Sequence, residues 1–473
     1  MYHLKEDELF DALGKNVRQV FNPGFRIFSS LLTDSRQIKK DSIFVAIKGE
    51  HFDGHEFIKK SLENGAKAVI SEKPMDRAHK NMLKRKKALF IHVSDSLKAL
   101  AAIAGHNRMR SRARIISITG SNGKTTTKDF LSALLSTRFK TVASQASFNN
   151  HLGVPLTLLK ISPDTEYAVV EMGMNHRGEL LKLAVLAQPD VAVVTNIAES
   201  HMEFFKGKKD VAAAKAEIFK GLKPSGYAVI NRDTPYYSYL KNKAMRRVVS
   251  CGKHRSARYR VTEVRDRKGE YSFLFGKRGK TKRYHLGIPG EHNLCNAVLA
   301  MTVCCEEGVT GQSVREGLSM IRLPKMRMEI HRYRDGITVI NDAYNANPFS
   351  TDRAIDAFSR MEHGGRKIMV FADMLELGKK SREYHQKIGK KALKAGIDIF
   401  FCTGKNARYS SEEFNASARD GRRSCFIASK TALAERLSRV MKRGDAVLFK
   451  GSRGMRLENI IKIIWKNESK KQD

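Results

Sequence analysis

The chain of 473 residues is 41% apolar, which is enough for about three globular domains. Its 87 Lys and Arg against 49 Asp and Glu give a formal net charge of +38, a balance that favours anionic ligands over cationic ones. The chain has no apolar run of about 18 residues and its first residues are acidic and amphipathic, so we expect neither a membrane-spanning helix nor a secretory signal. We therefore expect a soluble cytoplasmic protein without membrane insertion.

The basic residues are scattered along the chain. The densest groups are Lys84 to Lys87, Lys277 to Arg283 and the pair Lys470 and Lys471, and none is interleaved with aromatic residues over a long stretch. A basic background on solvated surfaces explains this distribution better than a nucleic-acid-binding function does. We expect no nucleic-acid partner.

The first 109 residues predict a small α/β domain. Short strand patterns are separated there by polar, glycine-containing loops, at Ile43 to Ile47, Ala66 to Ile70 and Leu89 to Val93. This domain is taken as residues 1–109.

A second domain is predicted over residues 110–322, where strand and helix patterns alternate. The predicted strands are Ile115 to Thr119, Tyr167 to Glu171, Asp190 to Asn196 and Tyr227 to Asn231, with a helix from Glu179 to Leu186. Such alternation predicts a mostly parallel sheet covered by helices. A basic insert follows, in which RYRVTEV, YSFLFGK and KRYHLGI alternate with a period of two and predict antiparallel strands.

The alternation restarts after Leu323 and predicts a third domain over residues 323–473, a second doubly wound α/β unit. Its predicted strands are Ile337 to Asn341, Lys367 to Phe371, Asp398 to Cys402, Cys425 to Ile427 and Ala446 to Lys450.

The stretch ITGSNGKTTTK, residues 118–128, has the pattern of a strand, a glycine turn and a helix. Backbone N–H groups of such a turn, with a lysine and a hydroxyl, bind nucleotide phosphates and Mg²⁺. The pattern GxxxxGK[ST] needs a glycine where Ile118 stands, so this loop is a shorter variant. A tight turn with a capping threonine is the alternative for a bare GK, and the full context favours the phosphate loop.

Two of the following strands end near side chains that suit a metal site. Ligands of an open parallel sheet gather beyond the carboxyl ends of its strands. VVEMG places Glu171 there, and VVTNIAESH places His201 there. Thr125 and Glu171 offer the hard oxygen atoms that Mg²⁺ prefers, whereas His201 is a softer ligand that on its own is more typical of a structural histidine.

Five motifs carry a resemblance to a known family. TGSNGKTTTK, FNNHLGVPLTLL, EMGMNHRGEL, TNIAESHMEFF and AAKAEIF resemble the ATP-dependent Mur ligases of bacterial cell-wall (peptidoglycan) synthesis. TDSRQIKKDSIFVAIKGEHFDGHEFI, NDAYNANP, DMLELGKKSREYH and LFKGSRGM narrow the resemblance to the MurF type, which joins UDP-N-acetylmuramoyl-tripeptide to D-alanyl-D-alanine. The matches extend from about residue 33 to residue 455.

The resemblance implies three domains: a UDP-binding α/β domain, a central P-loop-type ATPase domain and a Rossmann-like C-terminal domain that closes over the nucleotide and binds D-alanyl-D-alanine. It also implies ATP and Mg²⁺ as cofactors. The tripeptide carboxylate attacks the γ-phosphate of ATP to give an acyl phosphate, and the dipeptide amine then displaces phosphate. The products are UDP-N-acetylmuramoyl-pentapeptide, ADP and phosphate. We expect a monomer.

The resemblance also assigns residues to these ligands. ATP is expected at Gly120, Ser121, Asn122, Gly123, Lys124, Thr125, Thr126, Asn296, Arg327 and Asp342. The catalytic group is expected to be Lys124, Glu171, His201 and Lys215, with Thr125, Glu171, His201 and a carbamylated Lys215 as metal ligands. The UDP-sugar, tripeptide and dipeptide are expected at Ser35, Arg36, Lys48, Gly49, Asn149, Asn150, Asn345 and Asn347.

Several of these residues have plainer alternatives. Lys215 could be a helix-surface lysine, Arg36 a surface ion-pair residue, and the sequence AsnPro at 347–348 a turn. His292 and Asn296 stand one helical turn apart and could face one ligand, although Asn296 could also cap the helix. Met326 and Ala372 stand where many relatives have glycine, so the backbone at these two positions is in question.

Four rival functions are weighed against the ligase. A sister ligase that adds the third amino acid and a folate polyglutamate ligase share the fold, and NDAYNANP and FNNHLGVP argue against both. A basic ATPase stimulated by nucleic acid belongs to a different class, and no recognition feature supports it. An inactive binding scaffold is disfavoured by Lys124, Thr125, Glu171 and His201.

Replacing the loop lysine tests the phosphate loop. Lys124→Ala is expected to abolish turnover while the fold stays intact, because Lys124 is the residue expected to reach the β- and γ-phosphate oxygens. Phosphate release and the circular dichroism spectrum measure the two effects. Retained turnover would refute the assignment of the loop.

Overall fold

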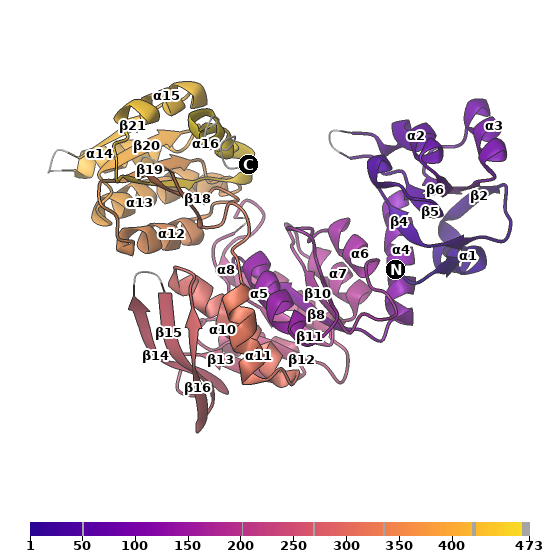
Figure 1. Ribbon diagram of the computed structural model, residues 1–473, viewed down its shortest axis with the longest axis horizontal. Helices are drawn as coiled ribbons and strands as arrows, with labels where there is room; N and C mark the ends of the chain where they lie inside the picture. Colours follow the sequence, from indigo (N-terminus) through magenta and orange to yellow (C-terminus); the bar gives the residue numbers. More distant parts are fainter. Residues whose placement is uncertain (50–51, 201, 268–269, 334–335, 419–421, 466–473) are drawn as a thin grey trace. The chain divides into compact units, whose positions relative to one another are not determined.

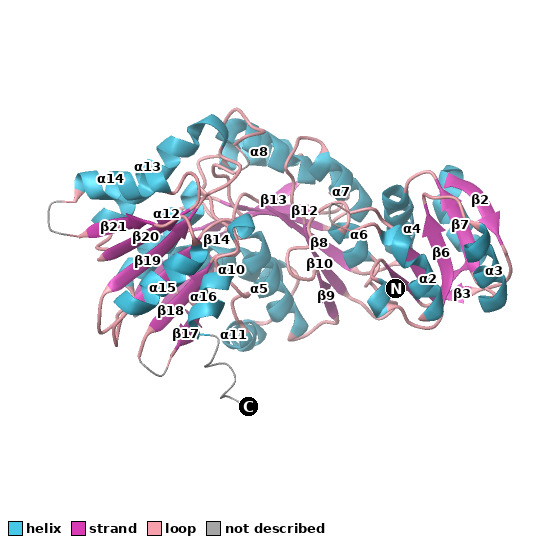
Figure 2. Ribbon diagram, turned by 90° about the horizontal axis from the view of Figure 1, so that it is seen from above, coloured by secondary structure: helices cyan, strands magenta, loops and turns pink. Residues whose placement is uncertain are grey.

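The computed structural model describes residues 1–49, 52–200, 202–267, 270–333, 336–418 and 422–465 (Figures 1 and 2). The chain divides into two compact units. The first comprises residues 1–119, 138–193 and 217–228, and the second comprises residues 120–137, 194–216 and 229–473. Within the described ranges, no helix is both long and apolar enough to cross a membrane.

The first unit begins with a sheet of order β2-β7-β6-β5-β4. Its strands are β2 (Val17–Phe21), β7 (Leu89–Val93), β6 (Ala66–Ser71), β5 (Ser42–Val45) and β4 (Ser30–Leu32). β2 pairs antiparallel with β7 and the other pairs are parallel. A further short pair joins β1 (Leu4–Lys5) to β3 (Ile27–Phe28).

Helices cover this sheet because its strands are apolar on both faces. The helices are α1 (Glu6–Leu13), α2 (Ile58–Glu63), α3 (Arg77–Lys86) and α4 (Ser96–Arg110). Phe44, Leu62 and Leu83 meet in one buried cluster that joins β5 to α2 and α3. The predicted strands β5, β6 and β7 are confirmed. β2 and β4 were not predicted, because no residue of β2 is buried and β4 has only three residues.

A second group of strands in the first unit has the order β11-β8-β10-β9. They are β11 (Val191–Val194), β8 (Arg114–Thr119), β10 (Tyr167–Glu171) and β9 (Thr141–Ala143). β10 lies parallel to both β8 and β9, and every residue of β10 is buried. The helices α6 (Gly153–Leu158) and α7 (Glu179–Ala187) accompany these strands. The alternation predicted from residue 110 onward is therefore confirmed.

Strand β12 (Tyr227–Asn231) crosses from the first unit into the second at Ala228. It continues the order β16-β15-β14-β13-β12, with β13 (Arg247–Gly252), β14 (Tyr259–Arg267), β15 (Glu270–Lys277) and β16 (Lys280–Leu286). β14, β15 and β16 pair antiparallel, as the period-two pattern predicted. Tyr259, Phe273 and Phe275 are buried in the core, whereas Arg260, Thr262 and Ser272, which alternate with buried residues, are polar and only partly buried.

Two helices of this part of the second unit pack against the helix that follows the predicted phosphate loop. That helix is α5 (Lys124–Ser136), and α10 (Glu291–Glu306) and α11 (Gly311–Met320) pack against it. The second unit also contains α8 (Lys208–Ala216) and α9 (Tyr237–Ala244).

The rest of the second unit is a sheet of order β17-β18-β22-β19-β20-β21. Its strands are β17 (Glu329–Arg332), β18 (Thr338–Asp342), β22 (Ala446–Lys450), β19 (Lys367–Ala372), β20 (Ile399–Thr403) and β21 (Arg423–Phe426). β17 pairs antiparallel with β18 and the other pairs are parallel. The predicted strands of this region are confirmed, and β17 was not predicted.

Two hydrophobic clusters lie on the two faces of this sheet. One contains Phe358 of α12 (Pro348–Arg360) and Ile388 of α13 (Ser381–Lys394). The other contains Leu433 of α15 (Lys430–Val440) and Ile460 of α16 (Glu458–Trp465). Figure 1 shows these helix pairs on opposite faces, and α14 (Arg408–Ser417) lies beside α13. The doubly wound architecture is confirmed.

The close contact between α11 and α5 generates a stability prediction. A Cβ atom added at Gly317 would lie 2.7 Å from Leu134 Cδ2 and 3.0 Å from Leu134 Cα. Gly317→Val is expected to lower the free energy of unfolding by about 1–3 kcal/mol, because α11 has to move away from α5. The urea midpoint measures the loss. Ser319→Val, on the exposed side of the same helix, is the matched control. Equal midpoints for the two variants would contradict this packing.

Candidate active site

The turn between β8 and α5 needs glycine at both of its ends. Gly120 has φ +148° and Gly123, the N-cap of α5, has φ +79°. A Cβ atom at Gly123 would collide with the side chain of Asn296, and one at Gly120 would collide with Thr195. Glycine therefore both permits the backbone conformation and leaves room for close neighbours.

The loop is anchored to the segment that follows β11. The Ser121 hydroxyl donates to the Ala198 carbonyl and accepts from the Ala198 N–H, at 3.0 Å in each case. The Ser121 N–H donates to the Asn196 carbonyl and the Asn122 N–H to Asn196 Oδ1. Two of the predicted phosphate-binding amides are thus engaged within the protein. The N-terminus of α5, where a helix favours anions, remains the place for a phosphate group.

Lys124, Thr125 and Arg327 come together at this helix start. Lys124 Nζ donates to the carbonyl of Gly120 at 2.9 Å. Arg327 Nη2 donates to Thr125 Oγ1 at 3.1 Å, and its guanidinium lies 4.2 Å from the ring centroid of Tyr344. Thr126 is buried in the first turn of α5. The site therefore gathers two cations and a hydroxyl from segments about 200 residues apart.

Asn347 links the phosphate loop to helix α12. Its Oδ1 accepts from the Ser350 N–H at 2.8 Å and so caps α12, while its Nδ2 donates to Asn122 Oδ1 at 2.7 Å. Asn345 is exposed, and its Oδ1 accepts from the N–H of Ala346. Asn347 therefore has a structural role at the loop in addition to any contact with substrate.

Asp342 forms a buried ion pair with a residue that sequence reasoning missed. Lys450 Nζ lies 2.7 Å from Asp342 Oδ2 and also donates to the carbonyl groups of Asp342 and Asn345. Asp342 Oδ1 accepts from the Met328 N–H at 3.0 Å. The only signal for Lys450 in the sequence was its position at the end of a predicted strand, in LFKGSRGM.

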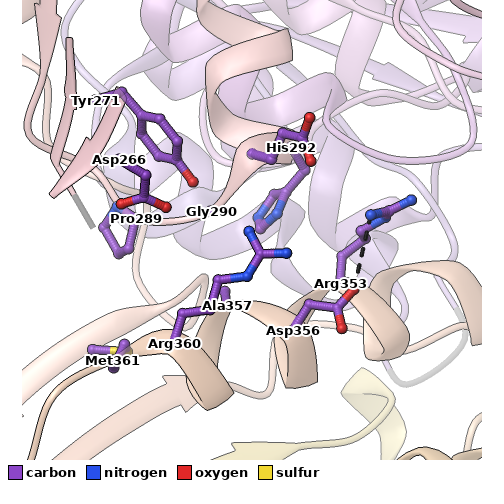
Figure 3. Close-up of a pocket in the computed structure, with 11 residues that line it drawn as sticks. Asp266, Tyr271, Pro289, Gly290, His292, Arg353, Asp356, Ala357, Arg360 and Met361 are labelled. Carbon is purple, nitrogen blue, oxygen red and sulfur yellow. Dashed lines mark ion pairs between the residues drawn. The ribbon is translucent and has the colours of Figure 1, made fainter. Parts of the chain in front are cut away.

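His292 lines a pocket of the second unit (Figure 3), whereas the side chain of Asn296 lies against Gly123. The pocket is lined by Asp266, Tyr271, Pro289, Gly290, Glu291, His292, Arg353, Asp356, Ala357, Arg360 and Met361. Figure 3 shows the Arg360 guanidinium turned toward the imidazole of His292. Burial lowers the pKa of His292 to about 4, and burial with the nearby Asp266 raises the pKa of Tyr271. Both rings are therefore neutral at neutral pH and can exchange uncharged hydrogen bonds with a ligand.

Glu171, in the first unit, is the last residue of β10. It pairs with Ile118 of β8, and Ile118 stands two residues before Gly120 in the chain. The side chain of Glu171 is buried; Oε1 accepts from Asn149 Nδ2 at 2.7 Å, and Oε2 has no hydrogen-bond partner among the described residues. A buried carboxylate oxygen without a donor is costly unless a cation neutralises it. Glu171 therefore fits a metal ion, and Asn149, which we predicted as a substrate contact, orients it.

The remaining metal candidates are less well defined. Lys215 of α8 is completely buried, so it is not the helix-surface lysine of the plainer alternative. His201 lies outside the described residues. In the described part of the chain, no three His, Cys, Asp or Glu side chains form a group able to hold a metal ion.

The predicted substrate residues of the first unit have varied surroundings. Asn150 Oδ1 accepts from the N–H groups of Leu152 and Gly153, at the start of α6. Ser35 is buried, and Lys48 and Gly49 are exposed. Arg36 has a side chain 79% exposed and pairs with Asp34 at 2.8 Å, which lowers the pKa of Asp34 to about 2. The ion-pair alternative for Arg36 therefore describes its state in this structure.

Three family models match the chain. They are described as Mur ligase family, catalytic domain (residues 28–108), Mur ligase middle domain (residues 118–304) and Mur ligase, glutamate ligase domain (residues 326–453). A Bacillus subtilis protein named UDP-N-acetylmuramoyl-tripeptide–D-alanyl-D-alanine ligase is 35% identical over 443 residues, which are 93% of this chain and 94% of that protein. The chain belongs to the Mur ligase family.

Solved structures agree with this membership. Crystal structure I of MurF from Acinetobacter baumannii has a TM-score of 0.87 at 26% identity and covers 98% of this Mur ligase and 99% of that chain. The crystal structure of MurF ligase from Thermotoga maritima in complex with ADP has a TM-score of 0.78 at 26% identity, covering 93% and 98%.

The two positions where this Mur ligase departs from the expected glycines are accommodated differently. Ala372 ends β19, and its methyl group faces Gly451, where an added Cβ would lie 2.9 Å away. Met326 and Met328 have φ +62° and +51°, so two left-handed residues flank Arg327. Met326 therefore has the positive φ that a glycine would adopt without strain. Because methionine carries a Cβ atom, this left-handed conformation is strained.

Substitutions at Met326 test this strain. Met326→Val is expected to lower the free energy of unfolding by about 1–2 kcal/mol and to reduce turnover, because a β-branched residue disfavours positive φ and displaces Arg327. Met326→Gly keeps the conformation and is expected to retain turnover. Thermal unfolding and phosphate release measure these effects, with Lys325→Val at the exposed neighbour as the control. Equal behaviour of Met326→Val and Met326→Gly would contradict the backbone described.

Proposed function

We propose that this Mur ligase joins UDP-N-acetylmuramoyl-tripeptide to D-alanyl-D-alanine, using ATP and releasing ADP and phosphate. The observation that carries the proposal is the meeting of Lys124, Thr125 and Arg327 at the start of α5. The names of relatives that align over nearly the whole chain support the choice of substrates. The reaction makes a cytoplasmic precursor of the cell wall.

ATP binds with its phosphates at the N-terminus of α5. The ADP complex of the Thermotoga maritima relative supports a nucleotide in this family. Lys124 exchanges its hydrogen bond to the Gly120 carbonyl for the β- and γ-phosphate oxygens, and Arg327 neutralises the same group. Asn296, which touches the loop glycine, and Asp342, which pairs with Lys450, are our candidates for further contacts with ATP.

The first chemical step is attack of the tripeptide carboxylate on the γ-phosphorus atom. The bond to the β–γ bridging oxygen breaks, ADP leaves, and an acyl phosphate forms. Both reactants are anions, so the positive charges of Lys124 and Arg327 lower the repulsion as they meet. Holding the two reactants in line supplies much of the remaining acceleration.

The second step is attack of the dipeptide amine on the acyl carbon. A tetrahedral intermediate forms, inorganic phosphate leaves with the C–O bonding electrons, and the amine loses a proton as the amide forms. Asn345 and Asn347 lie on the loop before α12 and are our candidates for orienting the dipeptide. Ser35, Arg36, Lys48 and Gly49 are the candidates for the UDP group, and Asn149 and Asn150 for the tripeptide end.

The residues also fit a bound Mg²⁺. Glu171, with its buried carboxylate oxygen, and Thr125, with its hydroxyl, would hold the ion, and His201 and a carbamylated Lys215 complete the proposed set. Bound Mg²⁺ neutralises phosphate charge and withdraws electrons from the γ-phosphorus atom. Asn149 keeps Glu171 oriented through its 2.7 Å hydrogen bond.

The domain plan that accompanies this function places the UDP group on residues 1–109, ATP on residues 110–322 and the dipeptide on residues 323–473. We propose these boundaries as functional divisions. Each holds one substrate, so the reaction requires all three regions.

Phosphate release tests the proposed function. With ATP, Mg²⁺ and UDP-N-acetylmuramoyl-tripeptide, release is expected to depend on D-alanyl-D-alanine, and mass spectrometry is expected to show the pentapeptide product. L-alanyl-L-alanine serves as the matched acceptor control. UDP-N-acetylmuramoyl-dipeptide with diaminopimelate or lysine tests the sister ligase, and product there would overturn the proposal. Release that responds only to added RNA or DNA would assign the protein to the nucleic-acid-stimulated class.

A further inference from the structure

The first unit carries two exposed apolar side chains beside a dense group of cations. Phe25 is fully exposed and Ile27 is 57% exposed; we call these two residues the apolar tip. Lys84, Arg85, Lys86 and Lys87 are all exposed at the C-terminal end of α3; we call these four the basic rim. Isolated exposed apolar residues are common, but here Asn22 and Arg26, close to the apolar tip in the chain, bond to the backbone of Ala88 and Lys87 and so bring the tip near the basic rim.

Hydrogen bonds hold the turn that carries the apolar tip against the end of α3. Asn22 Nδ2 donates to the Ala88 carbonyl at 2.9 Å, and Arg26 Nη2 donates to the Lys87 carbonyl at 3.2 Å. Glu6 fixes the turn from the other side, because it accepts from the Gly24 N–H at 2.7 Å and pairs with Arg26 at 2.7 Å. The apolar tip therefore projects from a braced turn.

The charges of the basic rim are not balanced locally. Residues 73–87 contain seven Lys and Arg and one Asp. Within this segment Lys73 pairs with Asp53 and His79 with Asp76, but among the described residues the basic rim has no acidic partner. Such a cluster repels itself, and the dipole at the C-terminus of α3 offsets only part of that cost.

A hollow next to the basic rim has the chemistry of an anion site. It lies between α2 and α3 and is lined by Lys59, Ala78, His79, Asn81, Met82 and Arg85. Figures 1 and 2 show α2 and α3 together in this unit. The cationic and amide groups of this hollow suit a phosphate group whose attached chain is apolar, since Met82 and Ala78 line the same wall.

We propose that the apolar tip and the basic rim dock this protein on the surface of an anionic phospholipid bilayer. Phe25 and Ile27 enter the headgroup region, and the basic rim and the hollow contact lipid phosphates. Each Lys or Arg near such a surface strengthens binding on the order of fivefold. Nucleic acid fits less well, because Phe25 is the one ring of the apolar tip on which a base could stack, and Ile27 beside it is aliphatic. The proposal does not depend on the ligase reaction.

Vesicle co-sedimentation of the full chain tests the proposal. Vesicles of phosphatidylglycerol and phosphatidylcholine are expected to bind the protein, and pure phosphatidylcholine vesicles are expected to bind at least about tenfold more weakly. High salt is expected to weaken binding, since charge steers it. Phe25→Ser/Ile27→Ser and Lys84→Glu/Arg85→Glu/Lys86→Glu are each expected to reduce the partition coefficient about tenfold or more.

Matched variants separate this surface from general charge and hydrophobicity. Met109→Ser/Met245→Ser removes two exposed apolar side chains, and Arg436→Glu/Arg439→Glu/Arg443→Glu reverses three exposed charges on the second unit. These controls are expected to bind as the native protein does, and phosphate release without vesicles is expected to be the same in all. The proposal is overturned if native protein ignores anionic vesicles, if the controls lose as much binding as the surface variants, or if only RNA or an acidic protein competes for the surface.

Discussion

The four-residue turn from Gly120 to Gly123 is the constraint on which the site depends. It is shorter than the common phosphate loop and therefore has fewer backbone N–H groups. Two of these, at Ser121 and Asn122, donate to Asn196. In return the turn is rigid, because Ser121 exchanges two hydrogen bonds with Ala198. A rigid turn fixes the direction of α5, and the direction of α5 decides where a phosphate group meets Lys124 and Thr125.

Segments from beyond residue 323 complete this turn. Asn347 reaches Asn122 and Arg327 reaches Thr125, so the loop is bonded to residues more than 200 positions away. The backbone around Arg327 sets the direction of its side chain. Met326 and Met328, on either side of Arg327, both have left-handed backbone conformations. Strain of this kind persists where the surroundings over-determine it, and here Glu329 accepts from the Met326 N–H while Asp342 accepts from that of Met328. The ion pair between Lys450 and Asp342 stabilises the same segment, because Asp342 also bonds to Met328.

The large positive charge has two kinds of explanation in this molecule. Lys450 pairs with Asp342, and Lys124 and Arg327, which donate to Gly120 and Thr125, are the cations that we propose to meet the anionic substrates. At the end of α3, the cations face solvent with no acidic neighbour among the described residues, and a braced apolar turn lies beside them. In the proposed reaction, the positive charges of Lys124 and Arg327 lower the repulsion between the anionic reactants. The second kind implies an anionic surface outside the protein.

By itself the sequence determined the α/β class, most buried strands and the strand, glycine turn and helix at residues 118–128, because these depend on local patterns: apolar runs, a period of two and glycines at a strand-to-helix turn. It missed short or half-exposed strands such as β2 and β17, where the local signal is weak. Only the tertiary structure decided that Asn149 orients Glu171, that Lys450 pairs with Asp342 and that His292 and Asn296 face different neighbours. Such pairings join residues far apart in the chain, and their distances and burial are set by packing, which no local pattern encodes.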